Sequence, residues 1–167
     1  MIDFSEAERN GYISAFVSFR QSEGSTRTPD DLRNTAEKLL KGCEQHFRAG
    51  VTRIARIGGV IPVGEDQDFH RLAKQLVHAS DLSDFHSAGQ EILSRFPLVA
   101  PWLSWWLRDE HASMIFNSHR RMDPVLWDSM PATTNAEEAM HWKIYQAVGK
   151  QHHLMEGIRA LYAFVEL

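Results

Sequence analysis

The sequence predicts a mainly α-helical protein. Over most of the chain, apolar residues recur at steps of three and four, which is the spacing of one buried helix face. The first example is the set Tyr12, Ile13, Phe16, Val17 and Phe19. Several segments also begin with helix-capping residues and end at Gly or Pro. No stretch alternates apolar and polar residues for long enough to predict a β-strand.

The helix boundaries follow from these local signals. Ser5 caps a helix that we expect to run to about Ser22, and Thr28 with Pro29 starts a second one that reaches Gly42. A third is expected over residues 43–57, ending at a Gly-Gly pair. Ser83 is the expected cap of a later helix that stops before Pro97. The remaining helices are predicted over residues 66–79, 102–107, 111–116, 135–148 and 154–166.

Length and composition bound the class of protein. The 167 residues suit a single domain. No run of about 18 apolar residues predicts a membrane span, and the single cysteine suits a reducing compartment. The formal charge of −4 differs from that of a dedicated nucleic-acid-binding module, which is usually basic. It is compatible with a catalytic fragment whose DNA-binding modules lie elsewhere.

A capping pattern marks the helix that follows the Met130-Pro131 turn. Asn135 is an N-cap and Glu138 lies at the third helical position, so each side chain is placed to accept a hydrogen bond from the other residue's backbone amide. Helix stability alone therefore explains both residues. His141 lies one turn beyond Glu138 and shares its face.

Three short motifs occur in an order that suggests a second interpretation. Asp3 follows a short apolar start, Cys43 and His46 form a Cys-x-x-His motif, and Thr134-Asn135-x-x-Glu138-x-x-His141 follows a long helical stretch. In this order they resemble the C-terminal part of a Mutator-like or hAT-like cut-and-paste DNA transposase. Members of that superfamily use a ribonuclease-H-like domain in which two Asp and one Glu hold the catalytic metals.

The resemblance implies metal-dependent DNA strand cleavage and transfer. Asp3 and Glu138 would be two of three ligands for a pair of Mg²⁺ or Mn²⁺ ions, and His141 would position Glu138 or a phosphate. The family's first Asp has no counterpart here, so we expect a fragment that is inactive alone and from which the sheet is largely absent. Residues 1–57 would contain Asp3 as the family's second Asp, followed by helices with the Cys-x-x-His motif. Residues 58–130 would form a helical insertion, and residues 131–167 would carry the Glu and the C-terminal helix.

The same resemblance implies DNA, specifically transposon ends, as the partner of the complete protein. An oligomer is compatible with it, and no membrane is involved. The location would be intracellular, and nuclear in a eukaryote. The rival interpretation is a non-enzymatic, all-helical interaction module, a domesticated transposon remnant, which the acidic balance and the incomplete site favour.

Cys43 and His46 have two interpretations. Residues three apart on a helix share a face, so the pair could supply half of a zinc site, with His111 and His119 as the nearest completions. No second closely spaced Cys/His pair exists, so we expect no bound zinc. The favoured interpretation is a buried Cys and a hydrogen-bonded, mostly buried His that pack the insertion onto the core.

The candidate DNA contacts also have structural alternatives. Trp105, between Trp102 and Trp106, is more typical of a core than of a base-stacking residue, although transposases that form hairpin ends hold a flipped base on an aromatic of the insertion. Basic residues suit phosphate binding, or simply form a solvated face with acidic neighbours. They are Arg48, Arg53, Arg56, Arg120 and Arg121.

Overall fold

The computed structural model describes residues 4–133, 142–146, 148–149 and 153–165. The chain divides into two compact units, Met1–Ala132 and Thr133–Leu167. Regular structure in the described residues is helical, with a single bridge residue at Gly42 and no strand, so the mainly α prediction is confirmed. The expectation of one domain over residues 1–167 stays a prediction.

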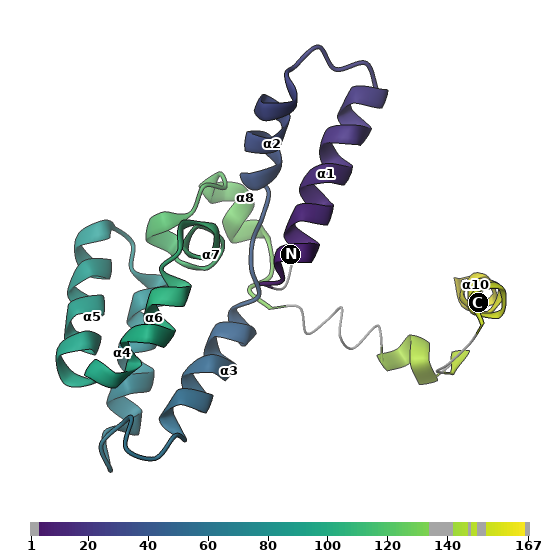
Figure 1. Ribbon diagram of the computed structural model, residues 1–167. Helices are drawn as coiled ribbons and strands as arrows, with labels where there is room; N and C mark the ends of the chain where they lie inside the picture. The colour runs from purple at the N-terminus through teal and green to yellow at the C-terminus, as the bar shows by residue number, and fades with distance from the viewer. Residues whose placement is uncertain (1–3, 134–141, 147, 150–152, 166–167) are drawn as a thin grey trace. The chain divides into compact units, whose positions relative to one another are not determined.

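The first unit begins with a helical hairpin, formed by α1 (Glu6–Ser22) and α2 (Pro29–Glu37), which run side by side in Figure 1. Both start where the sequence predicts, because the Ser5 hydroxyl accepts from the Glu8 amide and the Thr28 hydroxyl accepts from the Asp31 amide. A small core joins the hairpin to the rest of the unit. Its buried residues are Ile13, Ala36, Leu40 and Met114.

The predicted continuation of the second helix to Gly42 is wrong. α2 ends at Glu37, and the third helix, α3 (Glu44–Ala55), begins after the extended residue Cys43. The physical reason is that the Gly42 amide donates to the Met114 carbonyl, at 2.8 Å, and not to a carbonyl one turn earlier. A contact with a residue far along the chain therefore interrupts the helix.

The main core lies among α3, α4 (Asp66–His78) and α5 (Leu82–Arg95). Each helix buries residues at steps of three and four, so each has one apolar stripe turned inward. Asp81 caps α5 by accepting from the Asp84 amide, so the prediction of Ser83 as the cap is wrong. The largest fully buried side chains of these helices are Phe47, Phe69, Leu72, Leu76 and Ile92.

Short helices close this core. They are η1 (Pro97–Val99), α6 (Ala100–Trp106), α7 (Asp109–Ile115), η2 (Asn117–His119) and α8 (Pro124–Ser129). Trp106 is buried among aromatic rings, and Trp102 packs beside it. Gly50 permits α3 to approach Trp102 of α6 closely, since a Cβ atom at position 50 would lie 3.2 Å from the Trp102 indole nitrogen. The predicted helices at 102–107 and 111–116 are thus present within one or two residues.

The second unit contains helical residues 142–146 and α10 (Leu154–Val165). The start of the helix predicted over 135–148 lies outside the described residues. The described part of this unit exposes several large apolar side chains: Trp142, Tyr145, Met155, Ile158 and Tyr162. None of the described helices in either unit is long and apolar enough to cross a membrane.

The core of the first unit yields a stability prediction with an adjacent control. Ile92 has no exposed surface, whereas Leu93 is 39% exposed. Ile92→Ala should lower the free energy of unfolding by about 2–5 kcal/mol, because it removes transfer energy and leaves a cavity. Leu93→Ala should cost less than about 1 kcal/mol. Urea unfolding followed by circular dichroism measures both, and equal losses would contradict this assignment of the core.

Candidate functional site

A buried connecting segment, Lys41–Glu44, lies at the junction of several elements. Its four residues are buried although two carry charges, with Lys41 6% and Glu44 7% exposed. The Gly42 amide donates to the Met114 carbonyl of α7, and the Glu44 amide donates to the Ala132 carbonyl, both at 2.8 Å. The segment therefore holds together parts of the chain that are about 70 to 90 residues apart in sequence.

Phe4 reaches the same segment from the start of the chain. Its ring occupies the place where a side chain at position 42 would begin, so Gly42 permits the contact because it has no Cβ. The ring also packs edge-on against Trp106, with centroids 4.7 Å apart. Residues 4, 42–44 and 132 thus meet within the first unit.

Lys41 is the most unusual residue of the segment. Its ammonium donates to the carbonyls of Trp127 and Met130, at 2.6 and 3.0 Å, and lies 4.7 Å from the centre of the Trp127 ring. Burial lowers the pKa of Lys41, while the charges of Asp128 and Glu44 act in the opposite direction. The Trp127 carbonyl also accepts from the Met130 amide, at 3.3 Å, so Lys41 adds a second donor at the C-terminal end of α8 and a donor to the carbonyl of its cap residue, Met130.

Glu44 is a buried carboxylate whose charge is paired. Its Oε1 accepts from Nε and Nη2 of Arg48, at 2.9 and 2.6 Å, and lies 3.5 Å from Nε2 of His78. Glu44 is also the first residue of α3, where the helix dipole favours a negative charge. This residue therefore stabilises a helix start and its neighbours, and its Oε1 is already occupied by cationic and imidazole groups.

The Cys-x-x-His motif is arranged differently from its prediction. Cys43 is fully buried, as expected, but His46 is exposed, so the expected burial of both is wrong. Cys43 precedes α3 with an extended backbone (ψ 115°), and so does not share a helical face with His46. The predicted half zinc site required both residues to lie on one face of a helix, and this arrangement is not present.

The two histidines proposed to complete a zinc site have other surroundings. Nδ1 of His111 donates to the Trp105 carbonyl at 2.8 Å, because a carbonyl can only accept. His119 lies against the Phe85 ring, and its pKa is lowered by burial and then by the nearby His86. Among the described residues, no three His, Cys, Asp or Glu side chains are grouped so that they could hold a metal ion.

Trp105 packs within its own unit. The ring is half-buried, with its centroid 3.9 Å from that of His111 and 4.8 Å from that of Trp106. The interplanar angle with His111 is 31°, so the imidazole covers one face of the indole. This geometry favours the structural interpretation of Trp105 over base stacking.

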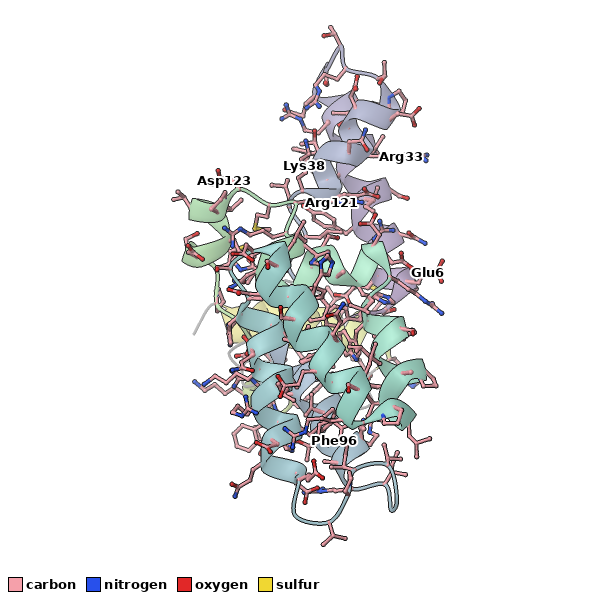
Figure 2. All side chains as sticks on the ribbon, turned by 90° about the vertical axis from the view of Figure 1, so that its left-hand side faces the viewer. Glu6, Arg33, Lys38, Phe96, Arg121 and Asp123 are labelled. Carbon is pink, nitrogen blue, oxygen red and sulfur yellow. The ribbon has the colours of Figure 1, made fainter. Side chains whose placement is uncertain are left out.

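The candidate phosphate-binding arginines fall into two groups. Arg48, Arg53 and Arg56 belong to α3 or its C-terminal cap and are exposed. Arg121 instead bridges two acids, because its guanidinium donates to Glu37 at 2.8 Å and also to Asp109. Its position beside the hairpin is visible in Figure 2. Arg120 is half-buried.

The residues of the predicted metal site itself lie outside the described part of the chain. These residues are Asp3, Asn135, Glu138 and His141. Sequence reasoning overlooked Lys41, since a lysine next to Leu39-Leu40 has no local signal of burial. No family model, curated protein or solved structure matches the chain.

The contacts of Lys41 yield the second prediction. Lys41→Met keeps the aliphatic stem but removes both donors to the α8 carbonyls, so it should lower the free energy of unfolding by about 1–3 kcal/mol. Lys38→Met is the matched control, because Lys38 is an exposed lysine only three residues away. Urea unfolding followed by Trp fluorescence compares the two. If both variants unfold at the same urea concentration as the wild type, the Lys41 contacts do not stabilise the fold.

The third prediction concerns zinc. We expect the purified protein to contain far less than one zinc ion per chain by elemental analysis, because four ligands are needed and no second Cys/His pair is available. Cys43→Ser should leave the metal content unchanged. One tightly held zinc per chain that disappears in Cys43→Ser would contradict this.

Proposed function

We propose that this chain derives from a cut-and-paste DNA transposase with a ribonuclease-H-like catalytic domain. In this proposal Asp3 and Glu138 are two of the three carboxylates at a two-metal centre for DNA strand cleavage and transfer. The chain by itself is inactive or nearly so, because the third carboxylate and its supporting strands have no counterpart in the sequence.

The observation that supports the proposal most directly is the meeting of Phe4, Gly42–Glu44 and Ala132. Phe4 is the residue after Asp3, Cys43 starts the Cys-x-x-His motif, and Ala132 lies just before the Thr134–His141 motif. The Phe4 ring contacts Gly42, and the Ala132 carbonyl binds the Glu44 amide. The order of the motifs along the chain suggests that they act together, and the contacts bring Phe4, Gly42–Glu44 and Ala132 together within the first unit.

The chemistry of the proposed ligands suits the proposed metals. Asp and Glu supply hard oxygen donors, which Mg²⁺ and Mn²⁺ prefer, and a bound metal pair would stabilise the charge that develops on the attacking and leaving oxygens. The protein's own contribution is to bring the carboxylates together. Glu44 is not a substitute ligand, since its Oε1 is bound by Arg48 and lies beside His78.

A helical interaction module is the second candidate, and exposed apolar residues favour it. Tyr12 and Phe19 on α1 are 36% and 59% exposed, and α10 exposes Met155, Ile158 and Tyr162. Such residues are typical of surfaces that contact another protein. A module of this kind would need neither Asp3 nor Glu138, so substitution of these two acids separates the two candidates.

The fourth prediction tests the catalytic role. The isolated chain should not nick DNA in the presence of Mg²⁺. When it is preceded by a segment that carries a strand-borne Asp, the protein should nick or join DNA, and Glu138→Gln should reduce that activity by at least about a hundredfold, because a metal ligand loses its charge. Gln retains the hydrogen bonding of the capping position, so the loss would not reflect the helix start.

The adjacent acid supplies the control. Glu137→Gln removes the same charge from the neighbouring position, which points about 100° away around a helix, and should leave activity within about twofold. The measurement is conversion of supercoiled plasmid to its nicked form. If Glu138→Gln and Glu137→Gln are equally active, Glu138 is a capping residue, and the transposase proposal loses its catalytic basis.

A further inference from the structure

The exposed side of α3 is basic, although the chain as a whole is acidic. The helix and its C-terminal cap carry Arg48, Arg53 and Arg56, and their only acid is Glu44. Glu44 is buried and paired with Arg48. Within the described residues, neither Arg53 nor Arg56 has an acidic side chain within ion-pair distance. The whole chain has 18 basic and 22 acidic residues, so this concentration of positive charge is a local feature.

A groove of about 400 Å³ runs between α3 and α4 beside this basic side. Glu44, Arg48 and Thr52 line it from α3, with Glu44 paired to Arg48, and His70 and Lys74 line it from α4. The floor is apolar and includes Val51 and Ala73. Arg48 on α3 and Lys74 on α4, whose side chains can bind anions, therefore line the two sides of an apolar floor.

Two of the three acids at the start of α4, Glu65 and Asp68, are paired with Arg95. Arg95 donates to Glu65 at 2.8 Å and to Asp68 at 2.7 Å. The Arg95 guanidinium also lowers the pKa of the Asp68 carboxyl, which favours its ionised form. Lys74 has no acidic partner within ion-pair distance in the described part of the chain. The lining of the groove carries two cationic side chains, Arg48 and Lys74, and one acid, Glu44, which leaves one positive charge in excess.

We infer that this groove, together with Arg56 at the C-terminal cap of α3, four residues beyond Thr52, binds the phosphodiester backbone of a DNA strand. The inference rests on the proposed function and assigns its DNA partner to a surface. Arg48 and Arg56 are eight residues apart, which is about 12 Å along the helix. That length matches between three and four nucleotides, at roughly 3.4 Å per step along one strand. A row of cations at this spacing suits a repeating phosphate chain better than a single anion.

The apolar floor suits the same ligand. A strand that places its phosphates on the rim can turn sugar atoms toward Val51 and Ala73, while the hydroxyl of Thr52 lies on the wall. Such contacts carry no sequence information, so binding should be independent of sequence and strongly dependent on salt. The site would hold DNA, and the metal centre of the proposed function would act on it.

A pair of charge reversals tests this surface against a matched pair elsewhere. Arg56→Glu/Lys74→Glu changes the cap of α3 and a residue within α4. Arg33→Glu/Lys38→Glu changes a residue within α2 and the cap of α2, which Figure 2 labels. Each pair replaces one Arg and one Lys, both exposed, and lowers the net charge equally. Lys74 lines the groove and Arg56 lies four residues beyond Thr52 at the end of α3, whereas neither Arg33 nor Lys38 lines the groove.

The measurement is fluorescence anisotropy of a labelled oligonucleotide, single-stranded and duplex, with the full chain at about 50–200 mM salt. The groove variant should bind about tenfold more weakly at the lowest salt. Its slope of log affinity against log salt should be smaller by about 1.4–1.8, which corresponds to two lost phosphate contacts. The hairpin variant should bind within about twofold of the wild type.

Three results would overturn the inference. They are equal weakening by both pairs, no binding of either DNA form by the wild type, and binding of anionic lipid vesicles but not DNA. If the groove variant does not fold by circular dichroism, Arg56→Gln/Lys74→Gln carries the same test, because Gln is a good helix former. Nicking that depends on Glu138 while both charge-reversal pairs bind DNA equally would refute this surface and leave the proposed function intact.

Discussion

The first unit depends on the burial of four connecting residues, Lys41–Glu44. A connecting segment usually lies at the surface, because its backbone groups need partners that water supplies. Here the amides of Gly42 and Glu44 find carbonyls at Met114 and Ala132 instead. Those bonds order the hairpin, α7 and the chain after α8 around one short segment. Each bond is weak by itself, yet leaving a buried donor without a partner would cost about 1–3 kcal/mol.

Lys41 supplies hydrogen-bond donors to carbonyls that lie beside the buried segment. The end of α8 approaches the segment, and the Met130 amide donates to two of its last carbonyls, those of Leu126 and Trp127. An ammonium group can donate to several carbonyls at once, and its aliphatic stem can be buried beside the Trp127 ring. Removal of the ammonium charge from water costs free energy, and this cost lowers the pKa of Lys41. The residue thus stabilises a helix end and the path of the chain toward residue 132.

The sequence predicted those helix starts that depend only on neighbouring residues. The hydroxyls of Ser5 and Thr28 bind amides three residues away, so their caps can be recognised without knowledge of the fold. The end of α2 and the position of Cys43 depend on Met114 and Ala132, which no local pattern reveals. His46 is exposed because it lies about 100° around α3 from the buried Phe47. Burial of Cys43 was predictable from its type.

α3 contributes both to the core and to the proposed DNA-binding surface. Its buried side carries Phe47 and Val51 into the core, so the backbone of α3 is fixed by packing. Gly50 brings the helix close to Trp102, which strengthens that contact. The exposed side chains of α3 are consequently held at constant spacing. A rigid row of cations loses less conformational entropy on binding a strand than cations on a loop would, and this favours α3 and its groove as the DNA-binding surface.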